Sequence, residues 1–187
     1  MLIAVIAAVA FGSAPFARSQ ALSITQTTDK PSLIAFVGGP VSLGSDPARV
    51  TLDAIAEPNV ERRSLAARIK TLAPDRHIYL VVRDLRVVGQ PGVLFRLYLD
   101  LPSDPKPVRT DSHYVGSLNF YSAAEPGRFD APNEKSPMFV SFDITRVLGK
   151  LQAQKLMSNE TTLTIIPTGT PAINSNPRIG RIEIIEQ

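Results

Sequence analysis

The sequence predicts an all-β fold, an antiparallel β-sandwich of about seven or eight strands with one short helix near residues 143–156. Short apolar or alternating runs recur along the chain, and segments rich in proline and glycine separate them. The 187 residues include sixteen prolines and eleven glycines, which favours frequent turns over long helices. This spacing is typical of sandwiches and barrels. We expect one domain, residues 32–187.

Each strand is predicted from its own pattern. Residues 33–37 form a short apolar run that the turn sequence Gly38-Gly39-Pro40 ends, and residues 50–55 alternate as a half-buried strand should. The clearest alternation lies at 93–101. The other expected strands span residues 77–85, 114–121, 138–142, 161–166 and 179–185.

The strand at 93–101 alternates throughout its length. One face is predicted to carry Val93, Phe95, Leu97, Leu99 and Leu101. The other face is predicted to carry Leu94, Arg96, Tyr98 and Asp100. The helix is predicted because Asp143 can cap it and apolar residues then recur at helical spacing, at Ile144, Val147, Leu148 and Leu151. Residues 62–72 form either a second short helix or an irregular crossover.

The first residues predict export. Residues 1–10 are an unbroken apolar run, and Ser19-Gln20-Ala21 fits the small-x-small rule for signal peptidase. We therefore expect a signal peptide at 1–21, a flexible segment at 22–31, and a periplasmic or extracellular protein. No lysine or arginine precedes the apolar run, so an uncleaved N-terminal anchor is the alternative, and only a retained leader would bring the protein to a membrane.

Composition and motifs argue against an enzyme with its own cofactor. The chain has no cysteine, and its two histidines, His77 and His113, are too few for a dicopper centre and are expected at the surface or at strand edges. No nucleophile elbow or phosphate-binding loop is present. Asp100 and Asp104 flank Pro102, which is typical of a turn.

The charge pattern argues against nucleic acid as a partner. The net charge is +3, but basic and acidic residues alternate and form no dense run. Residues 61–70 are the most basic stretch. We interpret them as a solvated face with local ion pairs in preference to a site for an anionic partner.

Six blocks of sequence carry a resemblance to a known family. They are YLVVRDLR at 79–86, PGVLFRLYLDLP at 91–102, HYVGSLNFY at 113–121, FDIT at 142–145, TIIPTG at 164–169 and RIGRIEI at 178–184. In this order and spacing they resemble the C-terminal domain of bacterial tyrosinases, to which a domain of plant polyphenol oxidases is related. The resemblance covers residues 33–185, whereas the helical copper-binding domain of the family has no counterpart in this sequence.

The resemblance implies a non-catalytic accessory domain. In the family this sandwich packs over the dicopper entrance and in several members shields it. We therefore expect a domain that binds, shields or helps mature a separately encoded tyrosinase-like copper oxidase. The alternatives are a binding or structural module of the cell envelope, an enzyme by itself, and a fragment of a longer gene.

Three tyrosines are the candidate partner contacts. Tyr98, Tyr114 and Tyr121 lie on or beside predicted strands, where a strand face or edge can present aromatic anchors to a partner. The alternative is that these rings complete the surface or the core of the sandwich, because aromatic residues are enriched in strands in any case.

Overall fold

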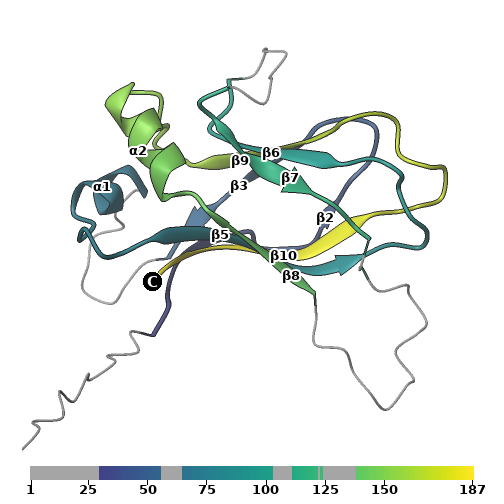
Figure 1. The fold of residues 1–187 in the computed structure, drawn as a ribbon, viewed down its shortest axis with the longest axis horizontal. Coiled ribbons are helices and arrows are strands. Elements are labelled where there is room, and N and C mark those ends of the chain that lie inside the picture. The colour runs from purple at the N-terminus through teal and green to yellow at the C-terminus, as the bar shows by residue number, and fades with distance from the viewer. Residues whose placement is uncertain (1–29, 56–64, 103–110, 122, 124–137) are drawn as a thin grey trace, which may run out of the picture.

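Two antiparallel sheets pack face to face, with two short helices at one end (Figure 1). This computed structural model describes residues 30–55, 65–102, 111–121, 123 and 138–187. The predicted all-β sandwich is confirmed. The predicted leader lies outside the described residues. Among the residues described, no helix is long and apolar enough to cross a membrane.

The larger sheet has the strand order β4-β1-β10-β5-β8, with β2 paired to β10. Its strands are β1 (Ser32–Phe36), β2 (Val41–Ser42), β4 (Asp53–Ala54), β5 (Ile78–Arg86), β8 (Phe139–Asp143) and β10 (Arg178–Glu186). The smaller sheet has the order β3-β9-β6-β7. Its strands are β3 (Ala48–Thr51), β6 (Phe95–Leu99), β7 (Tyr114–Leu118) and β9 (Thr162–Pro167).

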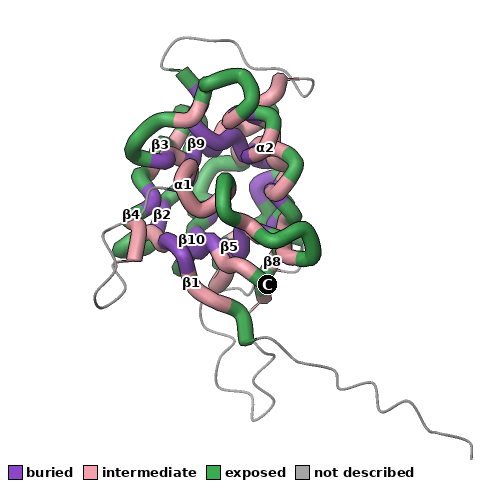
Figure 2. The backbone as a smooth tube through the Cα atoms, turned by 90° about the vertical axis from the view of Figure 1, so that its left-hand side faces the viewer, coloured by how far each residue is buried: buried purple, intermediate pink, exposed green. Residues whose placement is uncertain are grey.

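The buried residues gather between the two sheets (Figure 2). The alternating strands turn their apolar side chains toward this core. The predicted inner face of β6 is confirmed, since Phe95, Leu97 and Leu99 are fully buried. Its outer face differs from an ordinary solvated face. Tyr98 is also fully buried there, and Asp100 is 7% exposed.

The predicted strand at 50–55 is wrong as a single strand. The chain leaves the smaller sheet after β3 and joins the larger sheet as β4. Leu52 lies between them, buried, with its N–H donated to the Thr161 carbonyl at 2.9 Å. An apolar residue at every second position suits the inner faces of both sheets, so the alternation does not reveal the change of sheet.

Two helices close one end of the sandwich. Helix α2 (Thr145–Ala153) follows β8 directly, and Ile144, Leu148 and Leu151 are fully buried beneath it. The Asp143 carboxylate accepts the N–H of Thr145 at 3.0 Å, as a capping residue does. Helix α1 (Leu65–Lys70) packs beside α2. Of the two alternatives for residues 62–72, the structure therefore has the short helix and not the irregular crossover. Residues 62–64 lie outside the described part.

Candidate functional site

The outer face of the smaller sheet brings together polar and aromatic side chains from four strands. The strand register places Arg49 opposite Thr164, Thr164 opposite Tyr98, and Tyr98 opposite Tyr114. In the next row Arg96 lies opposite Ser117 of β7 and Ile166 of β9. We call this surface the small-sheet face, made up of Arg49, Arg96, Tyr98, Tyr114, Ser117 and Thr164.

The structure places two of the three predicted tyrosines, Tyr98 and Tyr114, in ring contact. The ring centroids of Tyr98 and Tyr114 lie 5.5 Å apart, and the Tyr114 hydroxyl is 3.0 Å from the Ser117 hydroxyl. Tyr98 is 0% exposed and so offers no surface to a partner, which corrects its selection as a contact residue. Tyr121 lies beyond the end of β7 and is 82% exposed. Partner contact through Tyr114 and Tyr121 stays a prediction.

Three polar atoms on the small-sheet face are buried without a hydrogen-bond partner among the described residues. They are Arg96 Nε, Tyr98 Oη and Thr164 Oγ1. Buried polar groups in native proteins are nearly always satisfied, because an unsatisfied one costs roughly 1–3 kcal/mol. Sequence reasoning did not find this set. The sequence feature that could have indicated it is the pair Arg96 and Tyr98, which are two residues apart and therefore lie on the same outer side of one strand.

One end of this face is held by a satisfied network. Asp100 has a positive φ of 48°, and its carboxylate accepts hydrogen bonds from Ser158 Oγ at 2.6 Å and from the Thr162 N–H at 2.9 Å. This bears out the turn role given to Asp100, whereas Asp104 lies outside the described residues. His113 was expected at the surface or at a strand edge. It directly precedes the edge strand β7, but it is 5% exposed and its Nδ1 lies 2.7 Å from the Leu99 carbonyl oxygen.

His77 lies at the surface, as predicted. Its Nδ1 is 3.0 Å from Oδ2 of Asp143, which precedes the N-cap residue Ile144 of α2. Partial burial raises the pKa of Asp143, but hydrogen bonds from Thr145 and His77 outweigh it and hold that pKa below its ordinary value. This pair joins the start of β5 to the end of β8.

The outer face of the larger sheet carries apolar side chains beside charged ones. Register with the buried residues of β5 and β10 directs Tyr79, Val81 and Ile185 away from the core, although Val81 is only 2% exposed. Phe36 lies beside Glu183 on the same face, and Phe139 at the sheet edge is 59% exposed. We call this surface the large-sheet face, made up of Leu33, Phe36, Tyr79, Phe139 and Ile185.

An internally satisfied ion-pair cluster sits within the large-sheet face. Glu183 is 7% exposed and accepts from Arg83 Nε at 2.9 Å and Arg181 Nε at 2.7 Å. The Arg83 guanidinium also stacks 5.2 Å from the centre of the Phe139 ring. The charges at the centre of this face are therefore already paired, and its apolar side chains surround them.

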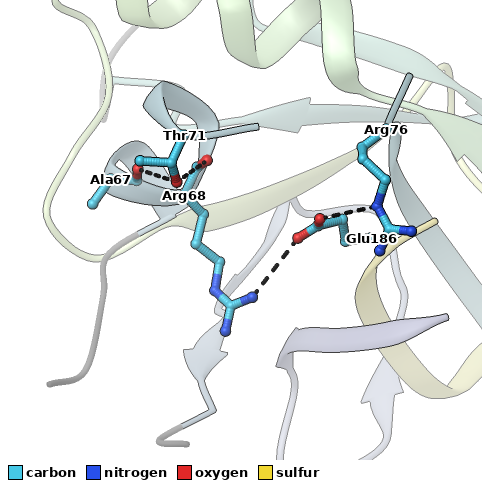
Figure 3. Close-up of polar contacts among 5 residues, drawn as sticks. All are labelled: Ala67, Arg68, Thr71, Arg76 and Glu186. Atoms are coloured by element: carbon cyan, nitrogen blue, oxygen red, sulfur yellow. Dashed lines mark hydrogen bonds and ion pairs between the residues drawn. The ribbon is translucent and has the colours of Figure 1, made fainter. Parts of the chain in front are cut away.

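Arg68, from the basic segment 61–70, forms an ion pair with an acidic residue of the protein itself. Arg68 Nη1 and Arg76 Nε reach the Glu186 carboxylate at 3.8 and 3.2 Å (Figure 3). The Thr71 hydroxyl donates to the Arg68 carbonyl at 3.2 Å. This acidic partner comes from β10. The local pairing expected within 61–70 would involve Glu61, which lies outside the described residues, so it stays a prediction.

Within the described ranges, no group of three or more His, Cys, Asp or Glu side chains is arranged to hold a metal ion. On the small-sheet face, three buried polar atoms have no hydrogen-bond partner among the described residues. The large-sheet face has apolar side chains around paired charges, which suit a protein surface.

Comparison with solved structures finds similar chains among polyphenol oxidases and tyrosinases. A recombinant latent aurone synthase, a polyphenol oxidase, has a TM-score of 0.44 and 15% identity over 79% of this chain and 25% of its own. Latent apple tyrosinase has a TM-score of 0.41 and 21% identity over 79% of this chain and 27% of its own. The chain thus spans about a quarter of these proteins.

Comparison with curated proteins finds no match. A protein-family model described as "Domain of unknown function (DUF7868)" matches residues 32–187, which is the whole length from the first strand to the last residue. The chain therefore belongs to the family DUF7868.

Proposed function

We propose that this protein is a non-catalytic accessory domain that binds a separately encoded tyrosinase-like copper oxidase, and that by binding it shields the copper site or assists its maturation. The resemblance of six sequence blocks to the C-terminal domain of tyrosinases supports this proposal. So does the scarcity of residues for catalysis, since the chain has no cysteine and two histidines.

The large-sheet face is the observation that carries the proposal. A sandwich that stands alone commonly keeps polar side chains on its outer faces. Here Phe36, Tyr79 and Ile185 are half-buried on the outer side, and Phe139 is more than half exposed. Apolar side chains left on an outer face favour an interaction with a partner, because covering them removes apolar area from water.

The charges of this face indicate what partner surface fits. Two arginines, Arg83 and Arg181, share the single carboxylate of Glu183. The cluster therefore carries one net positive charge inside an apolar surround. An apolar patch on the oxidase with a carboxylate at its centre would complement it in charge.

The proposal is tested by mixing the full chain with a tyrosinase-like oxidase of the same organism and measuring binding by calorimetry. We expect a one-to-one complex and a change in phenol oxidation by the oxidase or in its copper loading. Phe139→Ala should weaken binding at least tenfold, because aromatic anchors dominate protein interfaces. Phe139 is exposed, so the variant is expected to fold.

Ile173→Ala is the matched control. Ile173 is an apolar side chain that is 91% exposed outside both faces. Its loss should leave binding unchanged. Tyr121→Ala tests, in the same assay, one of the two tyrosines that remain predicted partner contacts. Absence of any complex, or equal effects of Phe139→Ala and Ile173→Ala, would contradict the proposal and favour a module of the cell envelope.

A further inference from the structure

We propose that β8 is a docking edge for a second copy of this chain, and that the two β8 strands pair antiparallel across a two-fold axis at Ser141. β8 is the last strand of the larger sheet and has a neighbouring strand, β5, on one side only. Strand addition at this edge lies in the plane of the sheet, so it leaves the large-sheet face open. The dimer is therefore independent of the proposed oxidase partner.

The hydrogen-bond ladder leaves backbone groups of β8 pointing away from the sheet. The Asp84 N–H donates to the Met138 carbonyl at 3.1 Å, and the Ile144 N–H donates to the Ile78 carbonyl at 2.9 Å. In an antiparallel pair such hydrogen-bonded residues alternate with residues whose N–H and C=O groups face the opposite way. The backbone groups of residues 139, 141 and 143 therefore point away from β5, and no strand of the described residues pairs with them.

β8 lacks the features that protect the other three sheet edges from pairing. Natural edge strands are kept apart by short length, charged side chains or irregular ladders. β4 has two residues, β3 carries Arg49, and the β6–β7 ladder shifts register between Leu97 and Tyr98. β8 has five residues, FVSFD, with a regular register and one charged side chain, Asp143, at its end. It is therefore the edge most open to a further strand.

A second β8 fits this edge best in one antiparallel register. Placing Ser141 opposite Ser141 of the second copy also brings Phe139 opposite Asp143, and the reverse. All three positions have outward N–H and C=O groups, so each pair can exchange two hydrogen bonds. A shift by two residues in either direction would form fewer such pairs. On the core side of the sheet, the half-buried Val140 and Phe142 of the two copies would become neighbours.

The side chains of the two copies complement each other in charge in this register. The Arg83 guanidinium lies 5.2 Å from the centre of the Phe139 ring, and its Nε donates to Glu183. The Arg83 side chain is 40% exposed. Asp143 of the second copy would lie next to Phe139, so its carboxylate would come beside the remaining N–H donors of Arg83. The same contact recurs across the axis, which favours a copy of this chain over an uncharged strand.

Self-association of the full chain, without any oxidase, tests the dimer. A pairing of two five-residue strands is small beside a permanent interface, so we expect a reversible dimer with a Kd between about 10 µM and 1 mM by sedimentation equilibrium. Amide exchange measured by NMR locates the contact. The N–H groups of Phe139, Ser141 and Asp143 should exchange more slowly as the protein concentration rises. A chain that stays monomeric at about 1 mM, or a dimer in which these three amides gain no protection, would overturn the proposal.

Charge variants at the two-fold axis decide whether β8 meets its own copy. Ser141→Lys and Ser141→Glu should each weaken the dimer at least fivefold, because like charges would stand directly opposite each other. An equimolar mixture of the two variants should restore it, since opposite charges then meet at the axis. Circular dichroism checks that each variant is folded.

Thr51→Lys is the matched control for the charge variants. Thr51 is an exposed residue of β3, at the edge of the smaller sheet, so this substitution should leave the dimer unchanged. Dimers as tight as wild type in both Ser141 variants, an equal loss in Thr51→Lys, or a mixture that stays monomeric would overturn the proposal.

Discussion

The two outer faces of the sandwich differ in which side chains are paired and which are exposed. On the large-sheet face the charged groups are paired, through Arg83, Arg181 and Glu183, and the apolar groups stand out. On the small-sheet face the aromatic group is hidden, since Tyr98 is fully buried, and polar atoms are left unpaired. The first face exposes apolar side chains, and the second holds buried polar atoms that have no partner among the described residues.

The largest expected effect comes from disturbing the larger sheet at Gly180. Asp84 has a positive φ of 56°, and a Cβ on Gly180 would lie 2.5 Å from the Asp84 Cβ. Neither atom can move without the backbone, so Gly180→Ala should lower the free energy of unfolding by about 3 kcal/mol. Urea denaturation measures the change. Arg83 and Arg181 flank the site, so the Glu183 cluster should be displaced as well.

A second glycine serves as the control for Gly180. Gly39 has nothing within 4 Å of its added Cβ. Gly39→Ala should therefore change the free energy of unfolding by less than about 0.5 kcal/mol. If both variants lose the same stability, the close approach of Gly180 to Asp84 does not constrain the larger sheet.

The next largest effect tests the polar anchor of the smaller sheet. Asp100→Asn keeps the size of the side chain and tolerates the positive φ, but it replaces an acceptor oxygen with an N–H donor facing Ser158 or Thr162. We expect a loss of about 2 kcal/mol in the free energy of unfolding, read from urea denaturation. The exposed Asp46→Asn should be neutral. A neutral Asp100→Asn would show that this network does not hold the end of the face.

The sequence was sufficient where a pattern is local. Alternation at 93–101 predicts Phe95, Leu97 and Leu99 in the core because successive side chains of a strand point to opposite sides. The helical spacing after Asp143 predicts α2 for a similar reason. Both patterns depend on residues within one element.

The sequence was insufficient where the outcome depends on distant partners. Tyr98 is buried on an outer face because Thr164 and Tyr114 lie beside it, and Thr164 is 66 positions away along the chain. No local pattern specifies that register. Leu52 illustrates the same limit, since alternation continues while the strand changes sheets. The unpaired atoms at Arg96, Tyr98 and Thr164 follow from pairing between β6 and β9, so they became visible only in the structure.

A smaller effect is expected at the edge of the larger sheet, at Asp143. Its pKa is lower in the folded protein than in the unfolded chain, so its carboxylate stabilises the fold at pH values above the unfolded value of about 3.9. That contribution is lost as the pH falls through the lowered folded pKa. The side chain is 46% exposed, so Asp143→Asn should cost only about 0.5 kcal/mol at pH 7.

The pH dependence separates Asp143 from other acidic residues. Melting temperatures of the wild type and of Asp143→Asn should converge as the pH falls through the lowered folded pKa of Asp143, because the carboxylate is then protonated in both folded and unfolded chains. Asp75→Asn, at an exposed position, is the control substitution. A gap between wild type and Asp143→Asn that does not narrow as the solution is acidified would mean that the interaction does not involve the charged carboxylate.

The smallest expected effect is the most informative about the small-sheet face. The Tyr98 hydroxyl is buried without a partner, so Tyr98→Phe should change the free energy of unfolding by less than about 0.5 kcal/mol or raise it slightly. Tyr114→Phe removes a hydroxyl that is paired with Ser117 and should cost about 1 kcal/mol. The buried Tyr98 hydroxyl would then contribute less to the free energy of unfolding than the half-buried Tyr114 hydroxyl.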